Sequence, residues 1–251
     1  MEFHTFISVA TNLEKLGVQS IDRAVYSYKP SLIPVTLRHL RQLSYFFSSE
    51  TCPNYLISPA LRVLSVMQQV GSDINAVAEL YSRSHFSLEK LYLYHNLQFS
   101  AVAPFLETDA VRGLVHLHLE VDDTTASERI TALTVTPSFC IFPGLLELSM
   151  VNYLSKALSN PDIVQCYLAM VRSRLPKDNG AATCCYLESF LKKVDLCVWH
   201  PEGAENIYVN GFRAFREGGL DAECHLTDDI EGSGRSHRHI GLRLCRDIAG
   251  I

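Results

Sequence analysis

A short apolar phrase that recurs along the chain limits its possible folds more than any other feature. The phrase consists of a leucine, two variable residues, a second leucine, one variable residue and a final apolar residue. Its five strict copies are Leu13, Leu16 and Val18; Leu61, Leu64 and Val66; Leu88, Leu91 and Leu93; Leu114, Leu117 and Leu119; and Leu145, Leu148 and Met150. Two looser copies are Leu40, Leu43 and Tyr45, and Leu191, Val194 and Leu196. The alternation of apolar and polar residues predicts a short strand with one buried face.

The spacing of the copies indicates a repeat. One such strand cannot bury its apolar face alone, so successive copies must pair side by side. The first four intervals between first leucines, from Leu13 to Leu114, fit the roughly 20–29 residue period of leucine-rich repeats, and the later ones are longer. We therefore expect an α/β leucine-rich-repeat-like solenoid. Its curved parallel sheet of about seven strands lies on the concave side, with helices and loops on the convex side.

The segments between the phrases have the apolar spacing of helices. Such spacing occurs in residues 73–82 and 99–106, in residues 163–175 after a helix start indicated by Asn160 and Pro161, and in a last helix that ends at Gly218 and Gly219. We expect residues 1–225 to form the solenoid. Residues 226–251 are expected to form a polar, weakly ordered tail, because their Gly, Ser, His and Arg residues offer little to bury.

Charge and hydropathy exclude several kinds of partner. The formal net charge of -5 argues against nucleic acid as a partner, since phosphates require a basic face. No apolar run approaches the roughly 18 residues needed to span a bilayer, which argues against a membrane partner. The first residues lack the charged and apolar regions of a signal peptide. We expect a cytoplasmic protein, with the nucleus as an alternative.

Four stretches carry a resemblance to a known family. They are residues 83–91, 142–148, 170–174 together with 191–194, and 215–221. In these stretches the chain resembles the leucine-rich-repeat region of F-box-like proteins from mushroom-forming fungi. The resemblance implies that the repeats select a substrate for a cullin-type ubiquitin ligase, to which an N-terminal F-box module docks. Here the first repeat begins at Leu13 without a preceding helical module of F-box length, so only the binding role carries over.

The variable positions of the phrase are the candidate binding residues. Within a strand they point away from the core leucines and, on a solenoid, face solvent on the concave side. The residues expected to contact a partner are Tyr92, Tyr94, His116, His118, Glu120, Glu147 and Ser149. We expect a non-catalytic module that binds a protein partner through these residues. The alternative from the resemblance is the substrate-recognition part of an F-box/cullin ubiquitin ligase, with a ligase substrate as the partner.

A metal- or thiol-dependent enzyme is the third alternative. Its candidate ligands are tail residues with thiolate or imidazole groups, which are the right ligands for zinc: Cys224, His225, His237, His239 and Cys245. Their spacing matches no zinc-finger pattern, and the chain has no nucleotide-binding loop, nucleophile elbow or HExxH motif. We expect no metal, no cofactor and no catalytic residue.

Overall fold

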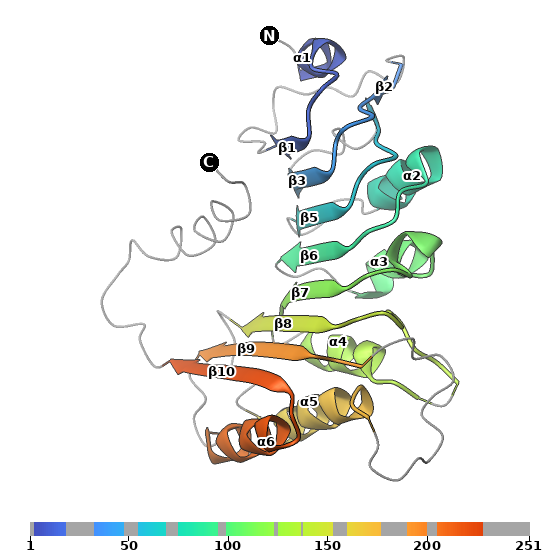
Figure 1. The fold of residues 1–251 in the computed structure, drawn as a ribbon. Coiled ribbons are helices and arrows are strands. Elements are labelled where there is room, and N and C mark those ends of the chain that lie inside the picture. The colour runs from blue at the N-terminus through green and yellow to red at the C-terminus, as the bar shows by residue number, and fades with distance from the viewer. Residues whose placement is uncertain are drawn as a thin grey trace.

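A computed structural model of the chain describes residues 3–18, 33–47, 55–68, 75–94, 99–122, 125–136, 138–152, 160–176, 190–199 and 205–227. Their central feature is an eight-stranded parallel sheet whose strands lie side by side in sequence order (Figure 1). The strands are β1 (Lys15–Val18), β3 (Gln42–Phe47), β5 (Val63–Gln68), β6 (Lys90–Tyr94), β7 (His116–Glu120), β8 (Glu147–Asn152), β9 (Lys193–Trp199) and β10 (Asp221–Thr227). The predicted α/β class with a large parallel sheet is confirmed.

The strand register aligns the apolar phrases with one another. The second apolar residue of each phrase pairs with that of the next, and all of these side chains are buried: Leu16, Leu43, Leu64, Leu91, Leu117, Leu148 and Val194. A repeated backbone contact precedes the strands. The carbonyl of Glu89, for example, accepts hydrogen bonds from the N–H groups of both Val115 and His116 in the next copy. The register therefore stacks equivalent residues into continuous rows, which buries a face that no single strand could bury alone.

The eighth strand, β10, is one more than the seven copies of the phrase predicted. Its register places Ala222 and Cys224 where the other strands have larger apolar residues, such as Leu148 and Met150 of β8. Ala222 is buried and Cys224 packs against the core, so small side chains take the core positions here. The strand continues through Leu226 and Thr227, which we expected to lie in the tail. Residues 228–251 lie outside the described part of the chain.

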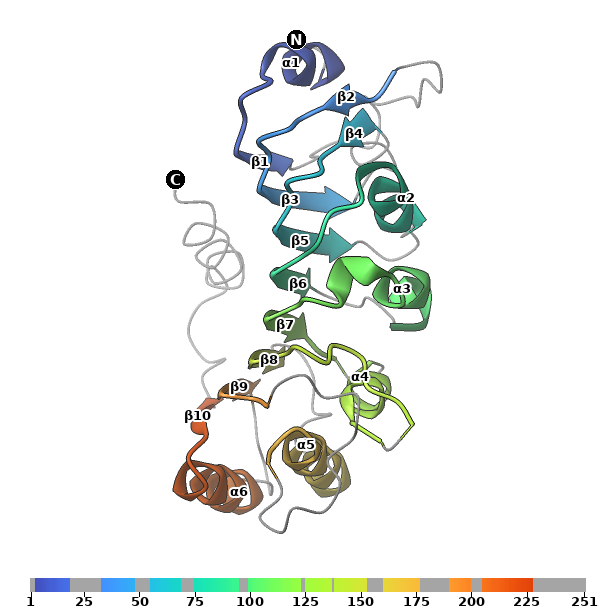
Figure 2. The same cartoon turned by 45° about the vertical axis from the view of Figure 1, so that its right-hand side comes forward.

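The helices pack one after another along one face of the sheet, as Figure 2 shows for α2, α3 and α4. They are α2 (Asn75–Ser84), α3 (Phe99–Leu106), α4 (Ala126–Leu133), α5 (Pro161–Ser173) and α6 (Glu205–Glu217). Asn160 caps α5 by accepting a hydrogen bond from the Asp162 N–H, and Gly219 follows α6 with a φ of 87°. These helix ends agree with the sequence prediction.

Some elements were not predicted. Helix α1 (Phe3–Val9) precedes the first strand of the sheet, and β2 (Val35–Thr36) pairs with β4 (Leu56–Ile57) in a small second sheet. A 3-10 turn, η2 (Asp109–Val111), follows α3. No helix of the described residues is both long enough and apolar enough to cross a membrane.

Arg174 connects the helices to the segment before β8. Its guanidinium is buried and donates hydrogen bonds to the carbonyls of Leu133, Phe142 and Ile141, at 2.8, 3.2 and 2.8 Å. Buried carbonyls need such partners, because an unsatisfied one loses its hydrogen bond to water without compensation. Arg174 therefore holds the end of α4 and the approach to β8 in fixed relative positions.

Candidate functional site

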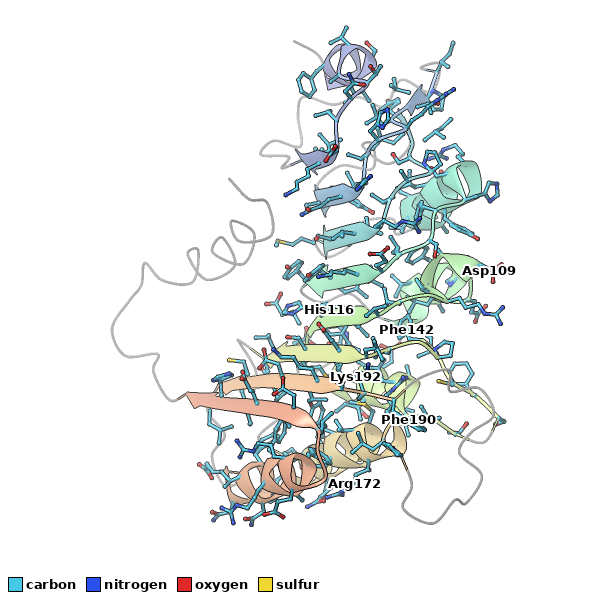
Figure 3. All side chains as sticks on the ribbon, in the orientation of Figure 1. Asp109, His116, Phe142, Arg172, Phe190 and Lys192 are labelled. Carbon is cyan, nitrogen blue, oxygen red and sulfur yellow. The ribbon has the colours of Figure 1, made fainter. Side chains whose placement is uncertain are left out.

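The candidate site lies on the open face of the sheet, by which we mean the face opposite the core leucines and the helices. Side chains alternate along a strand, so the residues between the core positions point to this face. The seven predicted binding residues come from the neighbouring strands β6, β7 and β8. Figure 3 shows His116 on the sheet and Arg172 away from it, on α5. The structure thus brings the predicted residues together on three adjacent strands.

Four of these residues form an aromatic cluster: Tyr92, Tyr94, His116 and His118. The Tyr92 ring is stacked on the Tyr94 ring, with their centroids 6.4 Å apart. The Tyr92 centroid is 5.3 Å from that of His116 and 5.7 Å from that of His118, and Tyr94 is 5.3 Å from His118. The cluster follows from the register, which places Tyr92 directly beside His118. The prediction that the two tyrosines share one face is confirmed.

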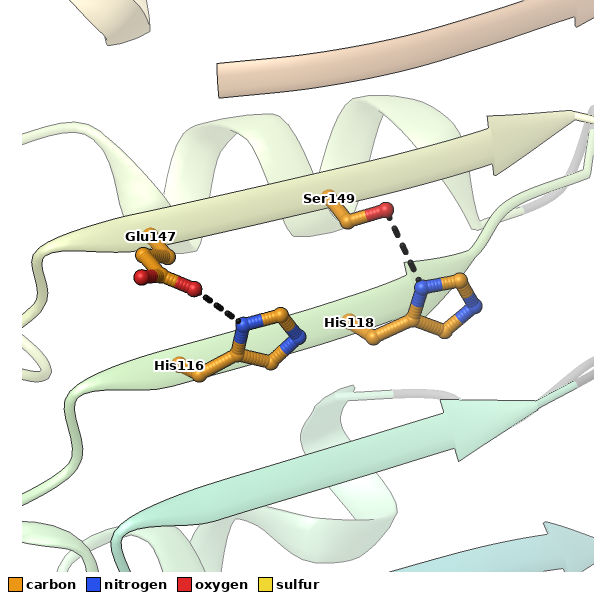
Figure 4. A network of polar contacts seen from close by, with 4 residues as sticks. All are labelled: His116, His118, Glu147 and Ser149. Atoms are coloured by element: carbon orange, nitrogen blue, oxygen red, sulfur yellow. Dashed lines mark hydrogen bonds and ion pairs between the residues drawn. The ribbon is translucent and has the colours of Figure 1, made fainter. Parts of the chain in front are cut away.

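Both histidines also contact β8 through hydrogen bonds between register partners (Figure 4). His116 Nδ1 lies 2.8 Å from Glu147 Oε2, and His118 Nδ1 lies 3.1 Å from Ser149 Oγ. The hydrogen bond from His116 lowers the pKa of the Glu147 carboxyl, and burial raises the pKa of Tyr92. These contacts hold the rings of the aromatic cluster in defined orientations.

The prediction that all seven side chains face solvent is wrong for three of them. Tyr94 and His118 are each 4% exposed and Glu120 is 8% exposed. His118 is covered because the rings of Tyr92 and Tyr94 pack against it. Tyr92, His116, Glu147 and Ser149 remain partly accessible and form the part of the site that a partner can reach.

Glu120 belongs to a different interaction from the other six. Its backbone carbonyl accepts a hydrogen bond from the fully buried Arg129 of α4, and its charge, like that of Asp122, favours the protonated guanidinium. Burial nevertheless lowers the pKa of Arg129 to about 10. An ion removed from water needs a nearby counter-charge. We therefore assign Glu120 mainly to stabilising the buried charge of Arg129 rather than to binding a partner.

The His116–Glu147 and His118–Ser149 pairs do not form the relay that nucleophilic catalysis requires. A serine nucleophile needs a histidine base that is itself oriented by an acid. Here Ser149 contacts His118, whereas Glu147 contacts the other histidine, His116. Burial lowers the pKa of His118 to about 4, so this imidazole is a weak base near neutral pH. The geometry suits recognition better than acyl transfer.

No protein-family model, curated protein sequence or solved structure matches the chain.

The structure separates the tail residues that the sequence suggested as zinc ligands. Cys224 and His225 are adjacent in β10, so they point to opposite faces: Cys224 packs against the core and His225 is exposed. One site in the strand cannot use both. His237, His239 and Cys245 lie outside the described residues.

Sequence reasoning missed a second polar group on the open face, formed by Asp195 of β9 with Glu223 and His225 of β10. The ligand atoms of these three side chains all lie within 4.8 Å of one another. Asp195 stands between the core residues Val194 and Leu196, which was a usable signal. Its neighbours could be found only by recognising β10, which has Ala222 and Cys224 at the positions where the phrase expects larger apolar residues.

Proposed function

We propose that this chain is a leucine-rich-repeat-like solenoid that binds a protein partner through the open face of its sheet and has no catalytic activity. The alignment of the apolar phrases in register, strand after strand in sequence order, supports the repeat assignment. In such an array, each strand contributes its variable side chains to one continuous surface.

The observation that carries the binding role is the aromatic cluster on the open face. Tyr92 and His116 are partly exposed, yet they are held by ring contacts and by the His116–Glu147 hydrogen bond. Aromatic side chains that are ordered before binding lose little conformational entropy on association, and tyrosine is enriched among residues that dominate interface energy. The neighbouring Glu147 and Ser149 add polar groups that can select a partner.

The test is affinity capture from a lysate of the source organism, with a face variant that carries Tyr92→Ala, His116→Ala and Glu147→Ala. Buried Tyr94 and His118 are left intact, because their removal would disturb folding. The matched control variant carries Gln165→Ala on α5 and Arg213→Ala on α6, both exposed and away from the open face. We expect a protein that is recovered by the wild type and the control, and reduced at least about tenfold with the face variant.

The thermal midpoint of each variant is measured in parallel, so that loss of folding is not mistaken for loss of binding. Equal recovery of the same proteins by all three chains would contradict the proposal. If a cullin-ligase adaptor is recovered with the partner, the ubiquitin-ligase alternative gains support over a free-standing recognition module.

A further inference from the structure

The group formed by Asp195, Glu223 and His225, which we call the β9–β10 cluster, lies on the open face at one edge of the described sheet. Glu223 and His225 are two residues apart in β10, so both point to the same side. Asp195 is the register partner of Glu223 in the neighbouring strand. Three potential ligands thus converge from two strands whose hydrogen-bonded pairing fixes their positions.

The two carboxylates of the β9–β10 cluster repel each other unless a positive charge lies beside them, either on protonated His225 or on a bound cation. Two carboxylates stand directly opposite each other, and like charges in such a pair destabilise a sheet. His225 Nε2 lies 3.7 Å from Asp195 Oδ1 and 3.5 Å from Glu223 Oε2. Lys193 is flanked in register by two other carboxylates, Glu147 and Asp221. When His225 is neutral, Lys193 offsets the repulsion only in part, and a divalent ion between the three side chains would remove it.

One oxygen of the cluster has no hydrogen bond. Asp195 Oδ1 is inaccessible to water and has no hydrogen-bond partner in the described structure. Burial raises the pKa of the Asp195 carboxyl, while His225 lowers it and Glu223 raises it. A buried carboxylate oxygen usually has a hydrogen-bond donor or a metal as its partner. This atom faces the other two potential ligands, which lie within 4.8 Å.

We propose that Asp195, Glu223 and His225 bind a Zn²⁺ ion. One imidazole and two carboxylates are ligand types that zinc accepts, and three protein ligands leave the fourth position of a tetrahedral site for water. The carboxylates must be ionised and His225 neutral to serve as ligands. The ion connects β9 to β10 at the edge of the sheet, and this site is independent of the aromatic cluster on β6 and β7.

The test is isothermal titration of Zn²⁺ into the full chain, prepared without a histidine tag. Wild-type protein is expected to bind one equivalent at this site, and both Asp195→Asn and His225→Ala to weaken that binding by at least about tenfold. A control variant, His237→Ala with His239→Ala and Cys245→Ala, removes the other imidazole and thiol groups of the C-terminal segment. It is expected to retain the site.

A second measurement separates loss of ligands from loss of folding. Zn²⁺ should raise the thermal midpoint of the wild type and of the control variant, but not that of His225→Ala, whose midpoint in EDTA should match the wild type. No binding by the wild type, or the same affinity after Asp195→Asn and His225→Ala, would overturn the proposal. Binding that disappears only in the control variant would overturn it as well.

Discussion

His118 shows how a side chain on the open face becomes part of the packed structure. Its Nδ1 contacts Ser149 Oγ, and its ring lies among the rings of Tyr92 and Tyr94. Burial, together with the charge that His116 can carry, lowers its pKa to about 4. The folded protein therefore keeps this imidazole neutral over a pH range in which an ordinary histidine takes up a proton.

We predict that His118 makes the folded state less stable as the pH falls from about 6.5 to about 4. The unfolded chain has the higher pKa, so it binds the proton first and is stabilised. The contribution of His118 to folding is complete above the unfolded pKa and is lost as the pH approaches the folded one. Between pH 7 and pH 5 the effect on the free energy of unfolding is on the order of 2 kcal/mol.

Urea denaturation of the wild type and of His118→Asn at both pH values measures this contribution. Titrating groups that lie far from His118 are common to the two chains and cancel in the comparison. The variant should lose less stability than the wild type on acidification, even if it is less stable at pH 7. An identical loss in the two proteins would show that His118 titrates normally in the folded state.

At the scale of whole elements, the packing of α5 on α6 depends on one small residue. Gly211 of α6 faces Leu168 of α5, and a Cβ at Gly211 would lie 2.7 Å from both terminal carbons of that leucine. Leu168 and Gly211 are both buried, so the leucine has little room to move. The glycine is explained by the close approach of the helices.

We predict that Gly211→Ala lowers the free energy of unfolding by about 1–3 kcal/mol, because the cost of overpacking exceeds the gain in helix propensity. The control is Asn210→Ala, which places alanine at the adjacent exposed position and should be neutral or stabilising. Combining Gly211→Ala with Leu168→Val should recover part of the loss, since valine withdraws the clashing atoms. Denaturant titration of the wild type, Gly211→Ala, Leu168→Val and the double variant tests this coupling, and strict additivity would contradict it.

The elements that the sequence predicted were those with a strong apolar period. The leucine phrases predicted seven strands of the sheet, and Asn160, Pro161 and Gly219 indicated helix ends. Strand β10 was not predicted, because Ala222 and Cys224 occupy its core positions and do not match the apolar phrase. The predicted binding residues were found together, since register follows from the phrase. Their burial was not predictable, because it depends on how the rings of neighbouring strands cover one another.

For the molecule as a whole, the sequence order of the strands makes the contacts of the sheet local. Each strand pairs only with the copy before it and the copy after it in the described sheet. Stability in such an array is approximately a sum of the stabilities of the units and of the interfaces between neighbours. The interior strands are supported on both sides, whereas β1 and β10 form the edges of this sheet.

Because each strand of the described sheet pairs only with its neighbours, the position of a core substitution should decide which strands lose hydrogen-exchange protection. Leu16 of the edge strand β1 and Leu117 of the interior strand β7 occupy the same row of the core, and both are buried. Leu117→Ala should cost about 2–5 kcal/mol, because it leaves a cavity between two supported neighbours. It should reduce amide hydrogen-exchange protection in β6, β7 and β8. Leu16→Ala should cost less and reduce protection mainly in β1 and β3, because the remaining strands keep their own neighbours.

Exchange measured by mass spectrometry after each substitution distinguishes the two patterns. If Leu16→Ala instead lowered protection equally in all eight strands, the sheet would unfold as one cooperative unit and the nearest-neighbour description would be wrong.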